Sequence, residues 1–283
     1  MVVVRDESHQ IRECLRALRF ADEIVVVDTG STDDTVAIAR TVADRVVEFP
    51  GAAPGSPGAP PGPRPLIHSA KNFAFGEAAG PWILNFDADE RPTDALRDEI
   101  LKTLESADPD IAAYALPFTH YFFGRYLRHG GFRGSLVRLF RKGKLRYPED
   151  RAHSTPVVEG RIASLENLVV HFNHPRISDF LRKMDLYTSQ DAPLIARHGR
   201  GGLRNRPASD LNAWTFLRGP LGVFWNRYVR HRGFLDGVHG LVAAALLASY
   251  QFFETAKLWE HTHLPPEGQG GGAAAETHPA EVR

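Results

Sequence analysis

The first half of the chain alternates short apolar runs with segments whose apolar residues recur at helical spacing. Met1–Val4 and Ile24–Val27 are continuously apolar, which is typical of strands buried on both faces of a parallel sheet. Repeated β-α-β units with short connections predict an α/β fold with a mostly parallel, doubly wound sheet. The expected strands are 1–4, 24–27, 45–49 and 82–86, and the expected helices lie near 11–18, 33–43, 69–79 and 94–104, with Thr32 and Thr93 as caps of the second and the fourth.

A proline- and glycine-rich run interrupts this pattern at residues 51–65. Because such a composition cannot pack a core, we expect a disordered surface insertion there. We expect the α/β domain to cover residues 1–175, a helical extension to cover 176–262, and a disordered tail to cover 263–283.

The extension contains one long apolar segment, Val238–Trp259, of about the length of a membrane span. It also contains His239, Gln251, Glu254 and Lys257. These polar residues favour an amphipathic helix that lies on a protein or membrane surface, with a transmembrane helix as the alternative.

Basic residues gather just before that segment. Arg197–Arg232 contains eight arginines and a single acid, Asp210, interleaved with aromatic residues such as Trp214 and Trp225. A basic, aromatic segment can bind anionic lipid head groups, so we expect the inner-membrane surface as a partner. A helical face with solvated arginines is the alternative. We expect no nucleic-acid partner, because no nucleic-acid-binding motif accompanies the charge.

The composition is that of an ordinary globular protein, with 283 residues, 43% of them hydrophobic, and a formal net charge of zero. The single cysteine, Cys14, excludes an internal disulfide and fits a reducing compartment. The apolar N-terminal stretch is too short for a signal peptide, so we expect a cytoplasmic protein. A first strand would normally have a few more residues, and we expect the true start to lie slightly upstream.

Three acidic residues directly follow the apolar run 82–86. They are Asp87, Asp89 and Glu90, with Ala88 between the first two. In open α/β sheets, ligands bind at the carboxyl ends of the strands. Two carboxylates at i and i+2 on an extended segment point the same way, so both can face one hard cation. Mg²⁺ or Mn²⁺ at this place would hold a diphosphate. The alternative is a solvated acidic turn.

A second acid, Asp28, ends the run Ile24–Val27. Gly30 permits a tight turn after it, and Ser31 leads into a helix N-terminus. A carboxylate at a strand end can accept hydrogen bonds from a ribose or a base edge. The chain lacks the G-x-G-x-x-G of a dinucleotide site after its first strand, so a metal-bound nucleotide diphosphate fits better. The alternative is that Asp28 only caps its own turn.

These motifs resemble glycosyltransferase family 2, the inverting enzymes of the GT-A fold, and later segments resemble its bacterial lipopolysaccharide-core branch. The resemblance covers roughly residues 1–260 apart from the Pro/Gly insertion. The order and number of the motifs carry it. The family segments are Val3–Glu7, Ala21–Asp33, Ala70–Ala74 and Asn85–Glu90, and the branch segments are Phe122–Gly131, Val137–Arg141, Arg232–Gly240 and Ala256–Glu260.

The resemblance implies roles for the residues of the strand ends. Asp89, helped by Asp87, would hold Mg²⁺ or Mn²⁺ against the diphosphate of a nucleotide-sugar donor. Asp28 would contact the nucleoside, and Lys71 would add positive charge near the phosphates, with a surface lysine as the alternative. The remaining residues expected to bind the nucleotide sugar are Asp6, Glu7, Gly30, Ser31 and Asn72.

An inverting transfer also needs a general base to take the proton of the acceptor hydroxyl. Here the chain departs from the branch, because Ala152-His153-Ser154 stands where a His-Glu pair is usual. Asp150 is the first candidate and Glu149 the second. Glu159 is also open, and His153 could serve because its ordinary pKa lies near neutrality.

The resemblance places three further residues on the acceptor side: His129, Arg138 and His171. Arg138 lies in an alternating strand, where it could bind a phosphate or carboxylate with two hydrogen bonds. A solvent-facing strand residue is the alternative. The histidines and the lone cysteine form no zinc signature.

We therefore expect a metal-dependent inverting glycosyltransferase, cytoplasmic and peripheral to the inner membrane. It would move a hexose from a nucleotide sugar, expected to be UDP-linked, to a lipid-borne envelope glycan such as lipopolysaccharide core. The alternatives are transfer to a polyprenyl-linked sugar or to a protein, and a catalytically idle scaffold that binds nucleotide sugar at the membrane. A nucleotidyltransferase is disfavoured because the first strand lacks a glycine-rich basic loop.

Overall fold

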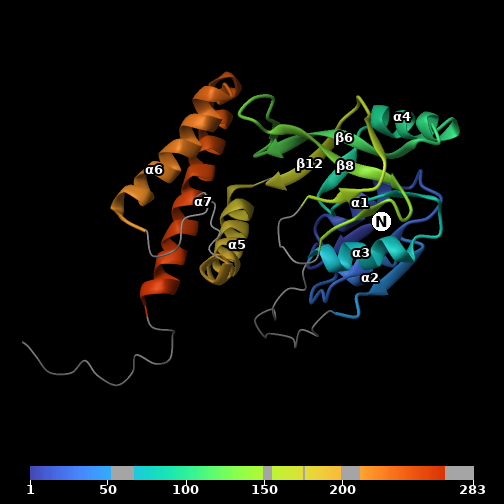
Figure 1. Cartoon of the computed structure of the whole chain (residues 1–283), viewed down its shortest axis with the longest axis horizontal. Helices are drawn as coiled ribbons and strands as arrows, with labels where there is room; N and C mark the ends of the chain where they lie inside the picture. Colours follow the sequence, from blue (N-terminus) through green and yellow to red (C-terminus); the bar gives the residue numbers. More distant parts are fainter. Residues whose placement is uncertain (52–66, 149–154, 175, 199–210, 265–283) are drawn as a thin grey trace, which may run out of the picture. The chain divides into compact units, whose positions relative to one another are not determined.

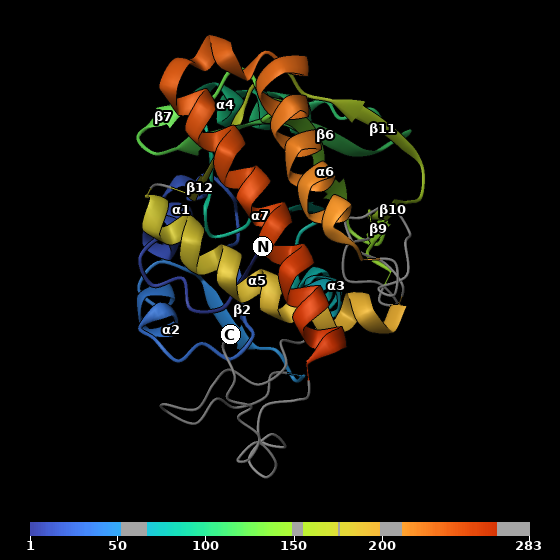
Figure 2. The ribbon, with the colours of Figure 1, turned by 90° about the vertical axis from the view of Figure 1, so that its left-hand side faces the viewer.

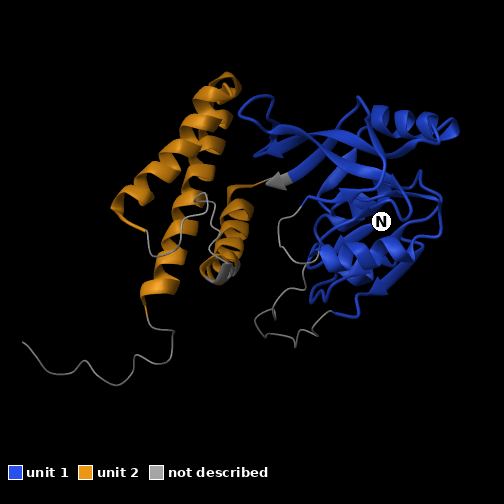
Figure 3. Cartoon of the chain, in the orientation of Figure 1, with its two compact units in different colours: residues 1–175 blue, residues 176–283 orange. Residues whose placement is uncertain are grey.

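The computed structural model of the chain describes residues 1–51, 67–148, 155–174, 176–198 and 211–264. The chain forms two compact units, Met1–Pro175 and Arg176–Arg283, which are coloured separately in Figure 3. Most of the proline- and glycine-rich insertion and of the C-terminal tail lies outside the described residues.

The first unit begins with a parallel sheet built from β-α-β units (Figure 1). Its strands are arranged in the order β1-β2-β3, and successive apolar residues point to opposite faces, as in any strand. The elements of this part are β1 (Val2–Val4), α1 (Ile11–Ala17), β2 (Val25–Asp28), α2 (Thr35–Ala39), β3 (Arg45–Glu48), α3 (Ile67–Glu77), β4 (Trp82–Leu84), β5 (Glu90–Pro92) and α4 (Asp94–Glu105).

Two apolar cores explain why β1 and β2 are apolar at every position. Val2 and Val26 pack on one face in a cluster with Ile11 of α1 and Leu96 of α4. Val3, on the other face, packs in a second cluster that contains side chains of α3. A sheet covered on both faces needs continuous rather than alternating apolar runs.

The second sheet of this unit is mixed and has seven strands. Strands β4 and β5 belong to it and not to the first sheet. Its central path is β4-β8-β6-β12-β5, and β8 runs antiparallel to both of its neighbours. An isolated parallel bridge between Val2 and Phe86 links it to the first sheet. The strands that complete it, with the small hairpin β9–β10, are β6 (Ile111–Phe122), β7 (Arg125–Tyr126), β8 (Arg133–Arg141), β9 (Leu145–Arg146), β10 (Val157–Val158), β11 (Arg161–Ser164) and β12 (Val169–His174).

The second unit is helical, and α6 and α7 run side by side in it, joined at one end (Figure 2). The apolar segment predicted at Val238–Trp259 lies within α7. The elements of this unit are α5 (Ile177–His198), α6 (Ala213–Phe224), the π-helical η2 (Trp225–Arg230), the 3₁₀-helical η3 (Gly233–Asp236) and α7 (Gly237–His263).

The predicted α/β domain followed by a helical extension is confirmed, but the prediction of a mostly parallel sheet is wrong for the seven-stranded sheet. That sheet is mixed, because β8 runs antiparallel to β4 and β6, and β5 runs antiparallel to β12. The prediction of the two helix caps is half right. The Thr93 side chain caps α4 by accepting from the Leu96 N–H at 3.2 Å. Thr32 does not cap α2, because that helix begins at Thr35 after Asp34. The Thr32 N–H instead donates to the Asp6 carboxylate at 2.7 Å, which ties it to another loop.

Candidate active site

The acids that follow β2 and β4 lie at one edge of the sheet. In the parallel pair of β1 and β2, Val4 is opposite Asp28. On the other side of β1, Val2 forms a parallel bridge with Phe86, so residues 87–90 continue past the same edge. The carboxyl ends of three neighbouring parallel segments therefore bring together acids that lie far apart in the sequence.

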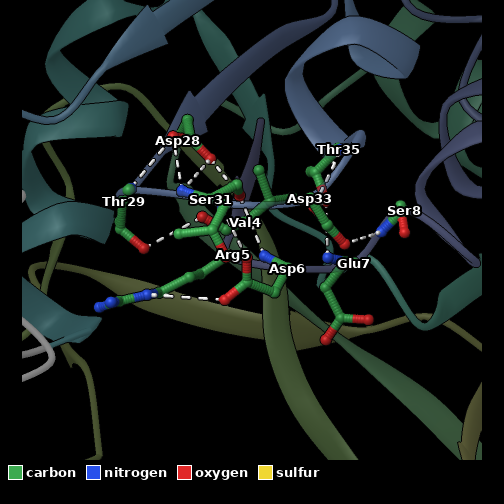
Figure 4. A network of polar contacts seen from close by, with 12 residues as sticks. Val4, Arg5, Asp6, Glu7, Ser8, Asp28, Thr29, Ser31, Asp33 and Thr35 are labelled. Carbon is green, nitrogen blue, oxygen red and sulfur yellow. Dashed lines mark hydrogen bonds and ion pairs between the residues drawn. The ribbon is translucent and has the colours of Figure 1, made fainter. Parts of the chain in front are cut away.

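Asp28 organises the turn that follows β2, as Figure 4 shows. Its carboxylate accepts hydrogen bonds from the N–H groups of Gly30 and Ser31, both at 3.0 Å, and from the Ser31 hydroxyl at 2.5 Å. Gly30 has a φ of 96°, a left-handed conformation that glycine adopts without strain. Asp28 is thus a cap of its own turn, and a direct contact of Asp28 with a nucleoside stays a prediction.

The loop after β1 is fastened to the same turn (Figure 4). The N–H of Asp6 donates to the Ser31 hydroxyl at 2.9 Å, and the Asp6 carboxylate accepts from the Thr32 N–H. The N–H of Glu7 donates to the Thr35 hydroxyl at 2.7 Å. Asp6 has a φ of 54°, so these bonds hold a backbone conformation that a non-glycine residue rarely adopts. The expected nucleotide-binding residues of both loops form one connected frame.

Asp87 is enclosed by two cations. Its carboxylate oxygens lie 2.8 Å from the Lys71 ammonium and 2.7 Å from the Arg138 guanidinium. Arg138 also forms an ion pair with Glu90, which is 2% exposed. Burial by itself would raise the pKa of Asp87, but Arg138 and Lys71 outweigh it and hold that pKa well below its usual range. Asp87 is therefore a permanent anion whose charge is already balanced by protein groups.

The alternatives of a surface lysine at position 71 and a solvent-facing arginine at position 138 are wrong. Lys71 is 8% exposed and Arg138 6% exposed, so neither is a solvent-facing residue. Arg138 lies with the acids of the strand ends, and its pKa is raised because Asp87 and Glu90 outweigh the effect of burial. Both side chains position the acidic turn.

Two other predicted site residues lie in different surroundings. Both groups of the Asn72 side-chain amide bond the backbone of Tyr147, each at 2.8 Å, so Asn72 fastens α3 to the chain after β9. His129 is half-buried in the segment between β7 and β8. Their predicted roles in donor and acceptor binding stay predictions.

Asp89 is paired with His171, which β12 carries next to the acidic turn. The His171 Nε2 lies 3.2 Å from the Asp89 carboxylate, and the Phe172 N–H donates to the Asp89 carbonyl at 2.7 Å. Burial would lower the pKa of His171, but its hydrogen bond to Asp89 and the charge of that carboxylate raise it. His171, predicted on the acceptor side, therefore contacts the predicted metal ligand directly.

Asp89 and His171 fit a divalent cation better than Asp87 does. They offer an oxygen and an imidazole nitrogen, and their side chains retain 12% and 20% exposure. Asp87 would first have to leave Lys71 and Arg138. Within the described ranges, no cluster of three or more His, Cys, Asp or Glu could hold a metal. The other ligands would therefore come from a diphosphate and water, as is usual for Mg²⁺.

Arg5, which directly follows β1, was not among the predicted site residues. Its side chain is 5% exposed, and no described residue accepts a hydrogen bond from Nε, Nη1 or Nη2. Its ion pair with Asp6 is long, at 3.9 Å (Figure 4). A buried cation without a close counter-ion is costly, so an anionic ligand would stabilise it. The signal in the sequence was a basic residue between an apolar strand and the Asp6-Glu7 pair.

The candidates for the general base, Asp150, Glu149 and His153, lie outside the described residues. Glu159 is described and exposed, and its N–H donates to the Lys144 carbonyl at 2.8 Å, beyond the hairpin strand β10. The choice among these four residues stays a prediction.

Comparison with known proteins supports the family resemblance. Residues 1–58 match the model of the family described as glycosyl transferase family 2. The uncharacterized glycosyltransferase RT0209 of Rickettsia typhi is 27% identical over 271 residues, which cover 92% of this chain and 85% of that protein. The lipopolysaccharide core biosynthesis glycosyltransferase LpsC of Rhizobium meliloti is 27% identical over 93% of this chain and 92% of its own length.

Among solved structures, TarS residues 1–349 of S. aureus in complex with UDP is similar to 91% of this chain and 90% of that chain. Its TM-score is 0.42, and its sequence identity is 15%. The sequence matches confirm the predicted resemblance to glycosyltransferase family 2 and to its lipopolysaccharide-core branch.

Proposed function

We propose that this chain is an inverting glycosyltransferase. It would move a hexose from a nucleotide sugar, UDP-linked by expectation, to a lipid-borne envelope glycan such as lipopolysaccharide core. The observation that carries the proposal is the single sheet edge where two acid-tipped strands, a histidine and buried cations meet. The similarity to LpsC over most of both chains supports the choice of acceptor.

The donor diphosphate would lie over this edge. Arg5 and Lys71 would face its negative charge, and Arg138 would keep the acidic turn in place by binding Asp87 and Glu90. The joined loops that carry Asp6, Glu7, Asp28, Gly30 and Ser31 would hold the nucleoside. A frame that is already bonded loses little entropy when the ligand binds.

Mg²⁺ or Mn²⁺ would be held by Asp89, with His171 as its neighbour and second ligand. When bound, the ion would act as a Lewis acid that neutralises the charge developing on the departing nucleotide. Asp87 contributes by fixing the turn from which Asp89 projects, because both of its oxygens are held by cations.

The transfer itself needs one proton to move. The acceptor hydroxyl oxygen attacks the anomeric carbon from the side opposite the diphosphate, and the base takes the hydroxyl proton. The bond between the anomeric carbon and the diphosphate oxygen breaks, and the nucleotide leaves. Asp150 is our first choice for the base, then Glu149 and His153. A positioned general base contributes about 10²–10⁴-fold to the rate.

We further propose that the protein works in the cytoplasm at the inner-membrane surface, where a lipid-borne acceptor would be found. Two enzyme alternatives keep the same donor site and use a polyprenyl-linked sugar or a protein as acceptor. An idle scaffold would also keep the donor site, and Ala152-His153-Ser154 is the feature that favours it.

The test is release of UDP by the purified chain from a panel of UDP-sugars, with Mn²⁺, Mg²⁺ or EDTA and with membrane glycolipid extract. We expect metal-dependent release from one donor, because many such enzymes slowly hydrolyse their donor. Asp89→Ala should lower this release by about 10²–10³-fold. Asp98→Ala, which removes an aspartate that is 66% exposed on α4, should leave it unchanged.

Each other outcome points to a different class. Metal-dependent binding of a UDP-sugar without turnover, even with extract, would indicate the idle scaffold. If the chain binds no nucleotide sugar at all, both the glycosyltransferase and the idle scaffold are refuted.

A further inference from the structure

Helix α6 has two apolar faces, and only one of them is packed. On the inner face, Phe216 meets Phe252 of α7 edge-to-face, with ring centroids 5.9 Å apart. Thr215 on the same helix is buried. The packed face of α6 is therefore the one that carries Thr215 and Phe216.

The outer face of α6 carries Trp214, Leu217 and Leu221, and Trp225 at the start of η2 continues it. Their exposed fractions lie between 57% and 63%. At 3.6 residues per turn, these four positions fall within about 80° of arc on one side of the helix. A stripe of large, exposed apolar side chains marks a surface that another apolar phase covers.

The stripe continues beyond the end of α6. The ring of Tyr228 in η2 contacts Phe224 at 5.2 Å and Phe234 in η3 at 6.2 Å, so the rings connect the end of α6 to the start of α7. Around Phe234 the chain exposes further apolar side chains. We call the following seven residues the outer apolar face: Trp214, Leu217, Leu221, Trp225, Phe234, Leu235 and Val238.

The charge around the outer apolar face has one sign. Residues 211–235 contain four arginines and one histidine and no acid. Arg218, Arg230 and Arg232 are exposed, whereas Asp236, the next acid, is 4% exposed. Two copies of such a surface would repel each other in a symmetric dimer, because the same patch would meet itself. A negatively charged apolar phase complements both properties.

We propose that the outer apolar face docks into the interfacial layer of a bilayer that contains anionic phospholipid. Tryptophans settle at the level of the lipid head groups, leucines reach the acyl chains below them, and arginines bind the phosphates. This inference deepens the proposed function, because a lipid-borne acceptor would then be presented to an enzyme already seated on its membrane.

The docked helices would lie in the interface and not cross it. Among the described residues, Gly233–His263 is one helical stretch long and apolar enough to span a membrane. Within it, Ala243, Ala244 and Leu258 are buried, and α7 packs against both α5 and α6. Lys257 forms an ion pair with Asp185 of α5 at 2.6 Å. The surface that meets lipid would therefore be the outer apolar face, whose residues belong to α6, η2, η3 and the first turn of α7.

The test is co-sedimentation of the full chain with vesicles of phosphatidylglycerol and phosphatidylcholine, compared with phosphatidylcholine alone. We expect binding to the anionic vesicles, weaker at high salt. Leu217→Gln with Leu221→Gln should weaken it by about tenfold or more. The control, Leu101→Gln with Ile162→Gln, removes two exposed apolar residues, 43% and 48% exposed, from the first unit and should bind as the wild type does.

A second pair of variants tests the charge. Arg218→Gln with Arg230→Gln should weaken binding to anionic vesicles and reduce its dependence on salt. Equal binding to both kinds of vesicle would overturn the proposal, as would unchanged binding by the leucine variant. A chain that alkaline carbonate cannot extract from vesicles would show a transmembrane α7 instead. A dimer in solution that the leucine variant abolishes would show a second copy as the occupant.

UDP release without vesicles separates this inference from the proposed function. The leucine variant should release UDP in solution at the wild-type rate, because its changes lie outside the donor site. Vesicle binding by a chain that releases no UDP and binds no donor would leave the docking surface standing and refute the glycosyltransferase.

Discussion

The first unit buries charged side chains, whereas the second unit exposes large apolar side chains. In Met1–Pro175, Arg5 and Arg138 are more than nine-tenths buried, and of these two only Arg138 has close acidic partners. In Arg176–Arg283, Trp214 and Leu221 on α6 are more than half exposed. Both arrangements cost stability in isolation, and a diphosphate would offset the first cost and a lipid surface the second. Departures from ordinary burial thus point to a different ligand in each unit.

The largest effect is expected from breaking the buried ion pairs of Arg138. Arg138→Met leaves Asp87 and Glu90 side by side without that guanidinium. We expect the free energy of unfolding to fall by about 3–5 kcal/mol, because removing one partner of a buried pair leaves an uncompensated charge. Urea unfolding followed by circular dichroism measures it.

Arg133→Met on the same strand is the control, since Arg133 is exposed. It should change the free energy of unfolding by no more than about 0.5 kcal/mol. Equal effects of the two variants would show that Arg138 is not the support of the acidic turn.

Arg5 should respond in the opposite direction. Arg5→Met removes a buried cation that lacks a close acceptor, so we expect the free energy of unfolding to rise by about 1 kcal/mol or more. The same change should weaken UDP binding by about tenfold or more, since a charge-assisted hydrogen bond to phosphate is lost. Thermal unfolding and calorimetric titration with UDP give the two values.

Arg16→Met on α1 is the matched control for Arg5, because Arg16 is 60% exposed. It should alter neither stability nor UDP binding. A variant of Arg5 that loses both stability and affinity would identify Arg5 as a structural residue and not as a ligand group.

The smallest effect is expected for the Glu99 carboxylate, which accepts hydrogen bonds from backbone N–H groups and, among the described residues, has no ion pair of the kind that holds Asp87. Glu99 on α4 accepts hydrogen bonds from the N–H groups of Glu166 and Asn167 at 2.8 and 2.9 Å. Partial burial would raise the pKa of Glu99, but these bonds lower it below its ordinary value of 4.5. The stability they contribute is present above pH 4.5 and is lost as the pH falls through the lowered pKa.

Glu99→Gln should therefore flatten the loss of stability below pH 4.5 by a small amount. Unfolding curves of both proteins across that range measure the difference. The ion pairs of Asp87 should persist in the same range, because Arg138 and Lys71 hold the pKa of Asp87 well below its usual value. Identical pH profiles for the wild type and Glu99→Gln would contradict this comparison of clamped carboxylates.

The sequence was sufficient to predict the sheet edge but not the contacts made there. Apolar runs that end in Asp28 and Asp87 mark strand ends, and parallel topology then places those ends together. The residues that contact Asp87, in contrast, could not be predicted from the sequence. Arg138 lies 51 residues away along the chain, and its alternating strand does not tell which face is buried.

The pattern of apolar and polar residues also did not predict the mixed seven-stranded sheet. The long strand β6 and its antiparallel partner β8 follow the α/β repeats, and no short turn motif announces their order. Arg5 was missed for a physical reason. Charged residues are almost never fully buried without a partner, so a basic residue at a strand end suggests an exposed side chain.

The central claim is that one sheet edge binds a metal-bound diphosphate through Asp89 and Arg5. The most direct measurement is calorimetric titration of the wild type, Asp89→Ala and Arg5→Met with UDP, each with Mn²⁺ and with EDTA. We predict that Mn²⁺ strengthens UDP binding by the wild type and by Arg5→Met but not by Asp89→Ala, and that Arg5→Met binds more weakly under both conditions. UDP binding that neither variant changes, or that EDTA leaves untouched in the wild type, would contradict the account.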